Sequence, residues 1–519
     1  MSEPQPRSRS PWQRAMARLL ALRSARVGLY LLAVYALLGL YAPFIASDIA
    51  LLWWDDDGLR LPILASLFNR FVYTEHHDFF FNVMALALPP VLIAARWGPW
   101  PGRRMQVLRY GLAAAVALAV IGMLPLAWLV TLTIAAALVT VGLWTASRLQ
   151  RGAAGLRIGV IIGAAVVVLV FPRSWISSAA LWRERGAPDT TFANLVNSRQ
   201  LAEHGLSALE SGDTVLHDDG RRLRLLFHFE DDDGTMQWQV RAVGQRGGTS
   251  FTVTEDDIHL IALRMALFPP VPHRFERPYR GAVLAGPGQI NEDSGRRFWL
   301  GTDATGRDVF ARLCFGARIS LTIGVLATLL SMGIGIVIGA VSGYWGGWVD
   351  LPLQRLVEIM MNFPTFLLVL VVIAMVGRDL MVIILVFGVT GWAGTARLVR
   401  GEFLALAGRE YVLAAEALGF SKSRIMFRHM LPNALTPLII SAAFGVAGTV
   451  LGESGLAFLG LVEARTPSWG LMLSDGRNNP QYYHIIYVPG LAIFGLVTAL
   501  NLIGNGLREA LDTRSEGAR

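Results

Sequence analysis

The sequence predicts an all-α polytopic membrane protein with about ten transmembrane helices and a small α+β domain inserted outside the membrane. Of the 519 residues, 54% are hydrophobic and only 16% are charged. Soluble domains carry about 25% charged residues, so most of this chain is expected to lie in lipid. Its apolar runs recur at lengths of about 20 residues, which a helix needs to cross a hydrocarbon core.

The predicted spans begin after a basic cytoplasmic tail, 1–26. The first transmembrane helix and its exit segment occupy 27–70, and an inserted region of four further helices occupies 71–172. The connections 96–109 and 148–157 contain arginines and no acidic residue, which favours the cytoplasmic side. The first five predicted spans are 27–46, 79–95, 108–125, 127–146 and 156–172.

The stretch 173–317 differs from its surroundings because long apolar runs are absent and polar turns are frequent. Alternating apolar residues at 222–229 and 236–243 predict β-strands. We therefore expect a small extracytoplasmic α+β domain here, ending in a motif that leads into the next span.

Five more spans are predicted within 318–510, and a total of ten returns the tail 511–519 to the cytoplasm, where the N-terminus also lies. Three glycines recur every fourth residue in the first of these five helices, at 335, 339 and 343. They form a small-residue face that allows close helix approach, either within the chain or against a second protein. The five spans are 319–342, 356–376, 379–398, 434–455 and 487–507.

The lysine content excludes one enzyme class, the P-loop ATPases. Lys422 is the only lysine, and it lacks the Gly-rich frame of a P-loop. Any ATP hydrolysis that drives this protein must therefore occur on another polypeptide. We expect no catalytic, cofactor-binding or metal site in the chain. The acidic and histidine cluster at 75–78 is interpreted as the start of a helix capped by Asp78, with a metal site as the alternative.

A charged, helix-forming segment at 410–433 separates two apolar runs. Gly419 is expected to end a first helix, and Ser421 to cap a second one. The pair Leu431 and Pro432 is expected to end that second helix where the next span starts. A rigid polar elbow between membrane spans indicates a soluble partner; the alternative is a solvated loop without one.

This segment is similar to the EAA loop by which permease subunits of ABC importers dock onto their ATPases. Leu413 stands where that pattern has Glu, a contact for which Glu410 or Glu416 could substitute. The matching residues are Ala414, Ala415, Gly419, Leu431 and Pro432. The resemblance implies an ATPase-docking loop over 410–432, with these candidate residues: Glu410, Tyr411, Ala414, Ala415, Glu416, Gly419, Arg424, Leu431 and Pro432.

The stretch 300–321 (LGTDATGRDVFARLCFGARISL) resembles the signature of the dipeptide, oligopeptide and nickel permease family, in particular its C-type subunit. Further matches occur in 346–364, 392–402 and 453–473, with Gln354 in place of the usual Met. The family-signature and pathway candidates are Asp303, Gly306, Arg307, Asp308, Arg318, Arg355, Glu358, Trp392, Arg397, Glu453 and Trp469. For Glu453 we favour a structural role, such as capping backbone amides, over lining the pathway.

The resemblance is closest to the microcin C-like branch. It implies the permease core of a type I ABC importer for peptides or peptide-like solutes, in the inner membrane of a bacterium. The implied partners are a B-type permease subunit, ABC ATPase subunits that bind the ATP, an extracytoplasmic substrate-binding protein and membrane lipid, but no nucleic acid. Region 71–290 has no counterpart that we recognise in ordinary members. The alternatives are a sensor or enzyme acting through 173–317, and a secondary transporter.

Overall fold

The structure is a computed structural model in which the chain forms two compact units. One comprises Met1–Leu38, Thr302–Thr305 and Phe315–Arg519, and the other comprises Gly39–Gly301 and Gly306–Cys314. The residues that the structure describes are 11–55, 58–69, 72–73, 75–97, 111–116, 214–216, 222–231, 236–242, 250–254, 265–290, 297–464 and 466–511.

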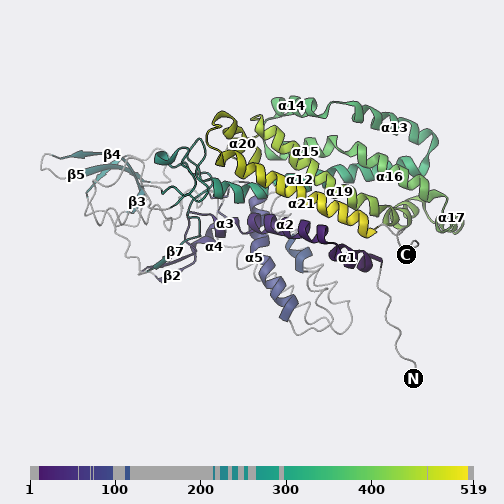
Figure 1. Cartoon of the computed structure of the whole chain (residues 1–519), viewed down its shortest axis with the longest axis horizontal. Helices are drawn as coiled ribbons and strands as arrows, with labels where there is room; N and C mark the ends of the chain where they lie inside the picture. Colours follow the sequence, from purple (N-terminus) through teal and green to yellow (C-terminus); the bar gives the residue numbers. More distant parts are fainter. Residues whose placement is uncertain are drawn as a thin grey trace, which may run out of the picture. The chain divides into compact units, whose positions relative to one another are not determined.

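The first unit is helical (Figure 1). Its described part contains five helices that are long and apolar enough to cross a membrane, or six if the bent pair α13–α14 is one span. The helices are α1 (Pro11–Ala21), α2 (Arg23–Leu40), α12 (Val309–Trp345), α13 (Gly347–Asn362), α14 (Thr365–Val376), α15 (Leu380–Thr390), α16 (Trp392–Ala407), α17 (Glu410–Ala417), α18 (Lys422–Arg424), α19 (Leu431–Phe458), α20 (Trp469–Asn478) and α21 (His484–Leu511), with the π-helix η4 (Ile425–Met430).

These helices correspond to the span predicted at 27–46 and to the five predicted within 318–510. Helices α15 and α16 together reach Ala407, beyond the predicted end at 398. The predicted spans 108–125, 127–146 and 156–172 lie almost entirely outside the described residues. The number of ten spans therefore stays a prediction, whereas the described residues are mostly helical and contain five or six helices that could span a membrane.

Helix α13 is followed by a sharp break, and α14 continues at 81° to it. The break falls at Phe363 and Pro364, because proline at this position cannot continue the hydrogen-bond ladder of the preceding helix. In Figure 1, α13 and α14 run along one side of the first unit, next to α15 and α16. Val369 and Ile373 of α14 pack into an apolar cluster with Ile383 of α15.

Helices α12 and α16 pack at very short range through the three glycines of α12. A Cβ added at Gly335 would lie 2.6 Å from the Cβ of Thr395, and one added at Gly343 would lie 2.7 Å from that of Phe403. A Cβ at Gly339 would collide with the carbonyl oxygen of Ala396. The small-residue face therefore packs against another helix of the same chain, which is the first of the two predicted alternatives.

The described part of the second unit contains two antiparallel sheets together with α3 (Ala42–Ile45), α4 (Pro62–Ser66), α5 (His76–Trp97) and the short η3 (Arg280–Ala282). Helix α5 covers the predicted span 79–95, but its apolar part, His77–Ile93, is shorter than a full span. Asp78 lies in the first turn of α5. One sheet has the order β2-β1-β7, from β1 (Leu52–Asp55), β2 (Gly58–Arg60) and β7 (Met265–Leu267).

The other sheet has the order β3-β4-β5-β6, from β3 (Thr214–Leu216), β4 (Arg222–Glu230), β5 (Met236–Ala242) and β6 (Phe251–Val253). The two predicted strands are present as β4 and β5. A β-bulge between Leu225 and Phe227 interrupts the alternation of β4. Leu223 and Leu225 are therefore buried, whereas Phe227 and Phe229 are exposed, although all four share one parity in the sequence.

The glycine contact generates a first prediction. Gly339→Val should lower the thermal unfolding midpoint of the purified protein, because the backbone carbonyl of Ala396 cannot move aside as a side chain could; overpacking of this kind costs about 1–3 kcal/mol. The matched control is Gly333→Ala on the same helix, where an added Cβ meets nothing within 4 Å. Equal midpoints for Gly339→Val and the native protein would contradict the tight packing of α12 on α16.

Candidate functional site

The predicted docking loop begins with α17, which ends at Gly419 as the sequence predicts. Gly419 has φ +71°, a conformation that costs other L-residues about 1–2 kcal/mol. Its N–H donates to Glu416 O at 2.9 Å, and the N–H of Phe420 donates to Ala415 O at 3.2 Å. This pair of bonds is a Schellman motif, which satisfies the last carbonyls of the helix and fixes the direction in which the chain leaves it.

The second half of the loop corrects the prediction that Leu431 and Pro432 end a helix. The chain is helical from Lys422 to Phe458 without a break, and the π-helix η4 directly precedes α19. The N–H of Leu431 bonds to Met426 O, five residues back. After this wider π-helical turn, a new α-helical hydrogen-bond pattern begins. Pro432 therefore lies in the first turn of α19, where the missing N–H of a proline is tolerated. Ser421 stands at the N-cap position of α18, but its side chain makes no capping hydrogen bond there.

The loop is joined to the transmembrane helices by its own apolar core. Val412 and Ala415 of α17 are buried together with Met426 and Met430 of η4. These side chains pack in one cluster with Phe403 of α16 and with residues of α12 and α19. Because burial of this kind holds elements together along their whole contact, α17 and η4 form a rigid elbow on the ends of three long helices.

The outer side of the elbow presents large apolar side chains to solvent. Leu418 is 72% exposed and Leu413, at the position of the family's Glu, is 53% exposed. We call Tyr411, Leu413, Leu418 and Phe427 the elbow surface; all four are exposed. Residues Glu410, Ala414, Arg424 and Pro432 are also exposed, and Leu431 is half-buried.

Polar contacts attach the elbow at two further points. The hydroxyl of Tyr344, near the end of α12, donates to Glu416 Oε1 at 3.1 Å. The side-chain amide of Asn433, in the first turn of α19, donates to the hydroxyl of Tyr411 at 3.3 Å. Arg424 lies over the ring of Phe420, 4.1 Å from its centroid, which is cation–π distance. Of the two acidic residues proposed to replace the missing Glu, Glu416 is thus bound within the chain.

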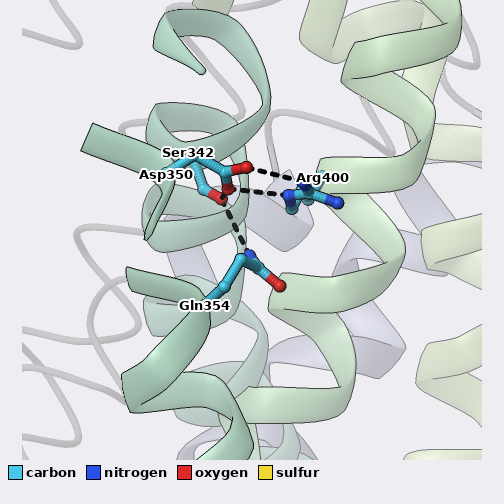
Figure 2. Close-up of polar contacts among 4 residues, drawn as sticks. All are labelled: Ser342, Asp350, Gln354 and Arg400. Carbon is cyan, nitrogen blue, oxygen red and sulfur yellow. Dashed lines mark hydrogen bonds and ion pairs between the residues drawn. The ribbon is translucent and has the colours of Figure 1, made fainter. Parts of the chain in front are cut away.

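An ion pair joins α13 to α16 close to the end of α12 (Figure 2). Arg400 donates from Nε to Asp350 Oδ1 at 2.7 Å and from Nη2 to Oδ2 at 2.6 Å. The Ser342 hydroxyl donates to Oδ1 of the same carboxylate, and Gln354 Nε2 donates to Ser342 Oγ at 2.9 Å. A two-pronged arginine–carboxylate pair with a further donor is the strong and geometrically specific form of this interaction.

Other signature candidates on α13 and α16 are more peripheral. Arg355 pairs with Glu358 at 2.7 Å on the surface of α13, and Arg397 is exposed on α16. Trp392 is buried against Val357 of α13. Exposed ion pairs contribute little to stability. The packing of Trp392 against Val357 therefore contributes more to holding α13 in place than the exposed pair Arg355–Glu358 does.

The candidates at 303–318 shape the turn that enters α12. Asp303 Oδ1 accepts hydrogen bonds from both the backbone N–H and the hydroxyl of Thr305, at 2.8 and 2.7 Å. Asp308 Oδ1 accepts from the N–H of Ala311 at 2.6 Å, as an N-capping residue does. Gly306 has φ +82°.

The remaining two of these candidates differ in burial. Arg307 is half-buried. Arg318 is fully buried, and its guanidinium lies 5.1 Å from the ring centroid of Phe315.

Glu453 and Trp469 meet where α20 begins. Glu453 is fully buried on α19 and accepts a hydrogen bond from Ser468 Oγ at 2.6 Å, while Ser454 Oγ lies 3.4 Å away. Trp469, next to Ser468, is buried over Gly316, where no side chain would fit. The carboxylate therefore ties α19 to the start of α20 through a hydroxyl, rather than through the backbone amides that we expected.

This contact gives the second prediction. Ser468→Ala should lower the unfolding midpoint, because a buried carboxyl that loses its hydrogen-bond donor costs about 1–3 kcal/mol. Ser454→Ala is the matched control, since that hydroxyl lies 0.8 Å farther from the carboxylate (3.4 against 2.6 Å) and should contribute less. A larger effect of Ser454→Ala than of Ser468→Ala would contradict the assignment.

The family-like stretches 346–364 and 392–402 include Asp350 and Arg400, but sequence reasoning missed their pairing, and it missed Ser342 and Tyr344 altogether. Neither a periodicity nor a motif connects residues 50 positions apart.

Comparison with known proteins identifies the same parts of the chain. Residues 335–517 match the family described as "Binding-protein-dependent transport system inner membrane component". Residues 10–57 match the "N-terminal TM domain of oligopeptide transport permease C". Residues 58–334 lie between the two matched segments.

Three proteins of similar sequence are all named as permease proteins of transport systems. The dipeptide transport system permease protein DppC of Alkalihalophilus pseudofirmus is 38% identical over 218 residues, which are 42% of this chain and 72% of the relative. The oligopeptide transport system permease protein OppC of Bacillus subtilis is 36% identical over 259 residues, 50% of this chain and 83% of the relative. The glutathione transport system permease protein GsiD of Pectobacterium atrosepticum is 35% identical over 228 residues, covering 44% and 76%.

The matched family, the identity to permeases over most of their length and the five or six apolar spans all agree. They describe a multi-pass inner-membrane protein that is a transport subunit and not an enzyme. The chain therefore belongs to the family of inner-membrane permease components of binding-protein-dependent ABC importers.

Proposed function

We propose that this permease is the C-type subunit of an ATP-driven importer of peptides or peptide-like solutes. The relatives support this substrate class, since they are named for dipeptides, oligopeptides and glutathione. Its partners are a B-type permease subunit, a pair of ABC ATPase subunits and an extracytoplasmic substrate-binding protein. ATP binds to the ATPase subunits, and this chain carries no cofactor of its own.

The observation that carries the proposal is the elbow at 410–432. Exposed leucines and aromatic rings at the tip of a rigid projection are typical of protein interaction sites. Arg409, Lys422, Arg424 and Arg428 are exposed within or directly before the elbow, so an apolar groove with an acidic rim would complement it. Leu413 replaces the family's Glu with an apolar contact, so docking here depends less on a polar contact at this position.

In this mechanism the ATPase pair closes on ATP and moves α17 and η4 as one body. The apolar core of the elbow passes that movement to α12, α16 and α19. The spans then exchange between inward-facing and outward-facing arrangements, because ATP binds one arrangement more tightly than the other. Glu453 keeps α20 attached to α19 during this exchange, which supports a structural role over lining the pathway.

We further propose a topology of ten spans with both termini in the cytoplasm, which places the elbow on the ATPase side. The sheet β3-β4-β5-β6 and strand β7 then belong to an extracytoplasmic domain within 173–317, and β1 and β2 of the exit segment pair with β7 on the same side of the membrane. The pattern of basic connections supports this orientation. An insert at 71–290 that crosses the membrane an even number of times leaves the core topology unchanged, and its outer part is positioned to hold the binding protein or the partner permease.

The assembly is tested by gentle affinity purification of this chain from its native membranes, with mass spectrometry of the proteins that accompany it. We expect a second permease and P-loop ATPases. Reproducible recovery of the chain alone, without ATPase activity, would contradict the proposal and favour an independent role for the outer domain.

The docking role gives the third prediction. Gly419→Pro should leave membrane insertion intact but uncouple ATP hydrolysis from uptake, because proline fixes φ near −65° and Gly419 has φ +71°. The measurement compares uptake with ATP hydrolysis in reconstituted vesicles. Gly408→Ala is the control: Gly408 precedes the elbow with φ −86° and has open space around it. Normal uptake in Gly419→Pro would refute the docking assignment.

A further inference from the structure

The carboxylate of Asp350 is the centre of a polar network that three helices share (Figure 2). Asp350 is 15% exposed and Arg400 is 30% exposed, so water screens their attraction only in part. Removing one member of such a pair leaves the other charge poorly solvated, which is costly. The network is therefore a strong local constraint on how α13 lies across α16.

Helix α13 is held on α16 at two points. The first is the ion pair, and the second is the contact of Val357 with Trp392 and Ala396. Seven residues, about 10 Å along a helix, separate Asp350 from Val357. Much of the remaining surface of α13 is exposed, including Trp348, Leu351 and Ile359. The orientation of α13, and with it the direction of α14 beyond the break, depends on the ion pair.

The end of α12 lies between this network and the elbow. Ser342 donates to Asp350, whereas Tyr344, two residues later, donates to Glu416 of α17. Gly343 between them lies against the backbone of Arg400, where an added Cβ would be 2.9 Å from the carbonyl oxygen. One helical turn therefore contacts the elbow, the ion pair and α16 at once. If α17 moves and pulls Tyr344 with it, the hydrogen bond between Ser342 and Asp350 in the same turn must move as well.

We propose that the Asp350–Arg400 ion pair couples α13 and α14 to the movement of the elbow during transport. Ser342 and Gln354 orient this pair. This inference rests on the proposed docking function and names the residues that carry its movement onward. Asp350 and Arg400 act through α13 and have no contact with substrate in this role. Gln354, which replaces the usual Met, adds a hydrogen bond that keeps the Ser342 hydroxyl directed at the carboxylate.

The test uses the complete transporter, with its partner subunits and binding protein, reconstituted in vesicles. The variants are Asp350→Asn, Arg400→Gln and Arg400→Lys. Three quantities are measured: recovery of the ATPases with the permease, the rate of ATP hydrolysis and uptake per ATP hydrolysed. For Asp350→Asn and Arg400→Gln we expect intact assembly and a roughly tenfold loss of uptake per ATP, within the range of typical coupling free energies.

Arg400→Lys should give an intermediate loss, since lysine keeps the charge but cannot form the two-pronged contact. Glu402→Gln, two residues farther along α16 and outside the hydrogen bonds of this network, is the control and should behave as the native protein. If Asp350→Asn is not recovered in folded form, the uptake per ATP of Arg400→Lys still tests the inference, because this variant keeps the charge.

Two results would overturn the inference. In one, uptake per ATP is unchanged in Arg400→Gln and Arg400→Lys. In the other, uptake and hydrolysis fall together in proportion to the assembled protein, as a purely structural role requires. Failure of the ATPases to accompany the native chain is distinguishable from both, because it would overturn the proposed docking function itself and this inference with it.

Discussion

The contact between α12 and α16 is the constraint on which the rest of the helical unit depends. Three glycines let the two backbones touch, and nothing larger fits at Gly339. Because helices this close cannot slide along each other without collisions, the axial register of α12 on α16 is fixed. This register brings Ser342 and Arg400 within hydrogen-bonding distance of Asp350, and Tyr344 within hydrogen-bonding distance of Glu416 of α17.

The polar and apolar parts of this unit have different tasks. Apolar packing joins the elbow to three long helices and makes it a rigid extension of them. The ion pair instead fixes α13, which buries little apolar surface, to α16 through a geometrically specific contact. Buried charge pairs contribute less to net stability than to the choice between alternative packings in some systems, and α13, with little of its surface buried, is a helix where such a choice matters.

Local features of the structure could be predicted from the sequence. Apolar run length identified the five or six candidate spans of the described residues, period-two alternation identified β4 and β5, and Gly419 identified the end of α17. Each of these depends on residues within one or two turns of one another. The candidate loop could likewise be found, since its pattern is contiguous.

Features that depend on a choice between near-equal local arrangements could not be predicted. Pro432 stops a helix in most settings, but one wide π-turn is enough to carry the chain past it. The alternation of β4 points Phe227 inward until a single bulge turns it outward. The pairing of Asp350 with Arg400 requires the register of α12 on α16, which only the assembled helices define.

The pairing of β1 with β7 has a consequence for the insert. Leu52 lies opposite Leu267, and Val271 exchanges backbone hydrogen bonds with Ile45 and Ser47. The chain therefore leaves and returns at neighbouring positions, although more than 200 residues intervene. The entropy of closing a loop grows only slowly with its length. As far as chain entropy is concerned, this strand pair can therefore close an intervening segment of widely varying length, because each doubling of that length adds only about 0.6 kcal/mol.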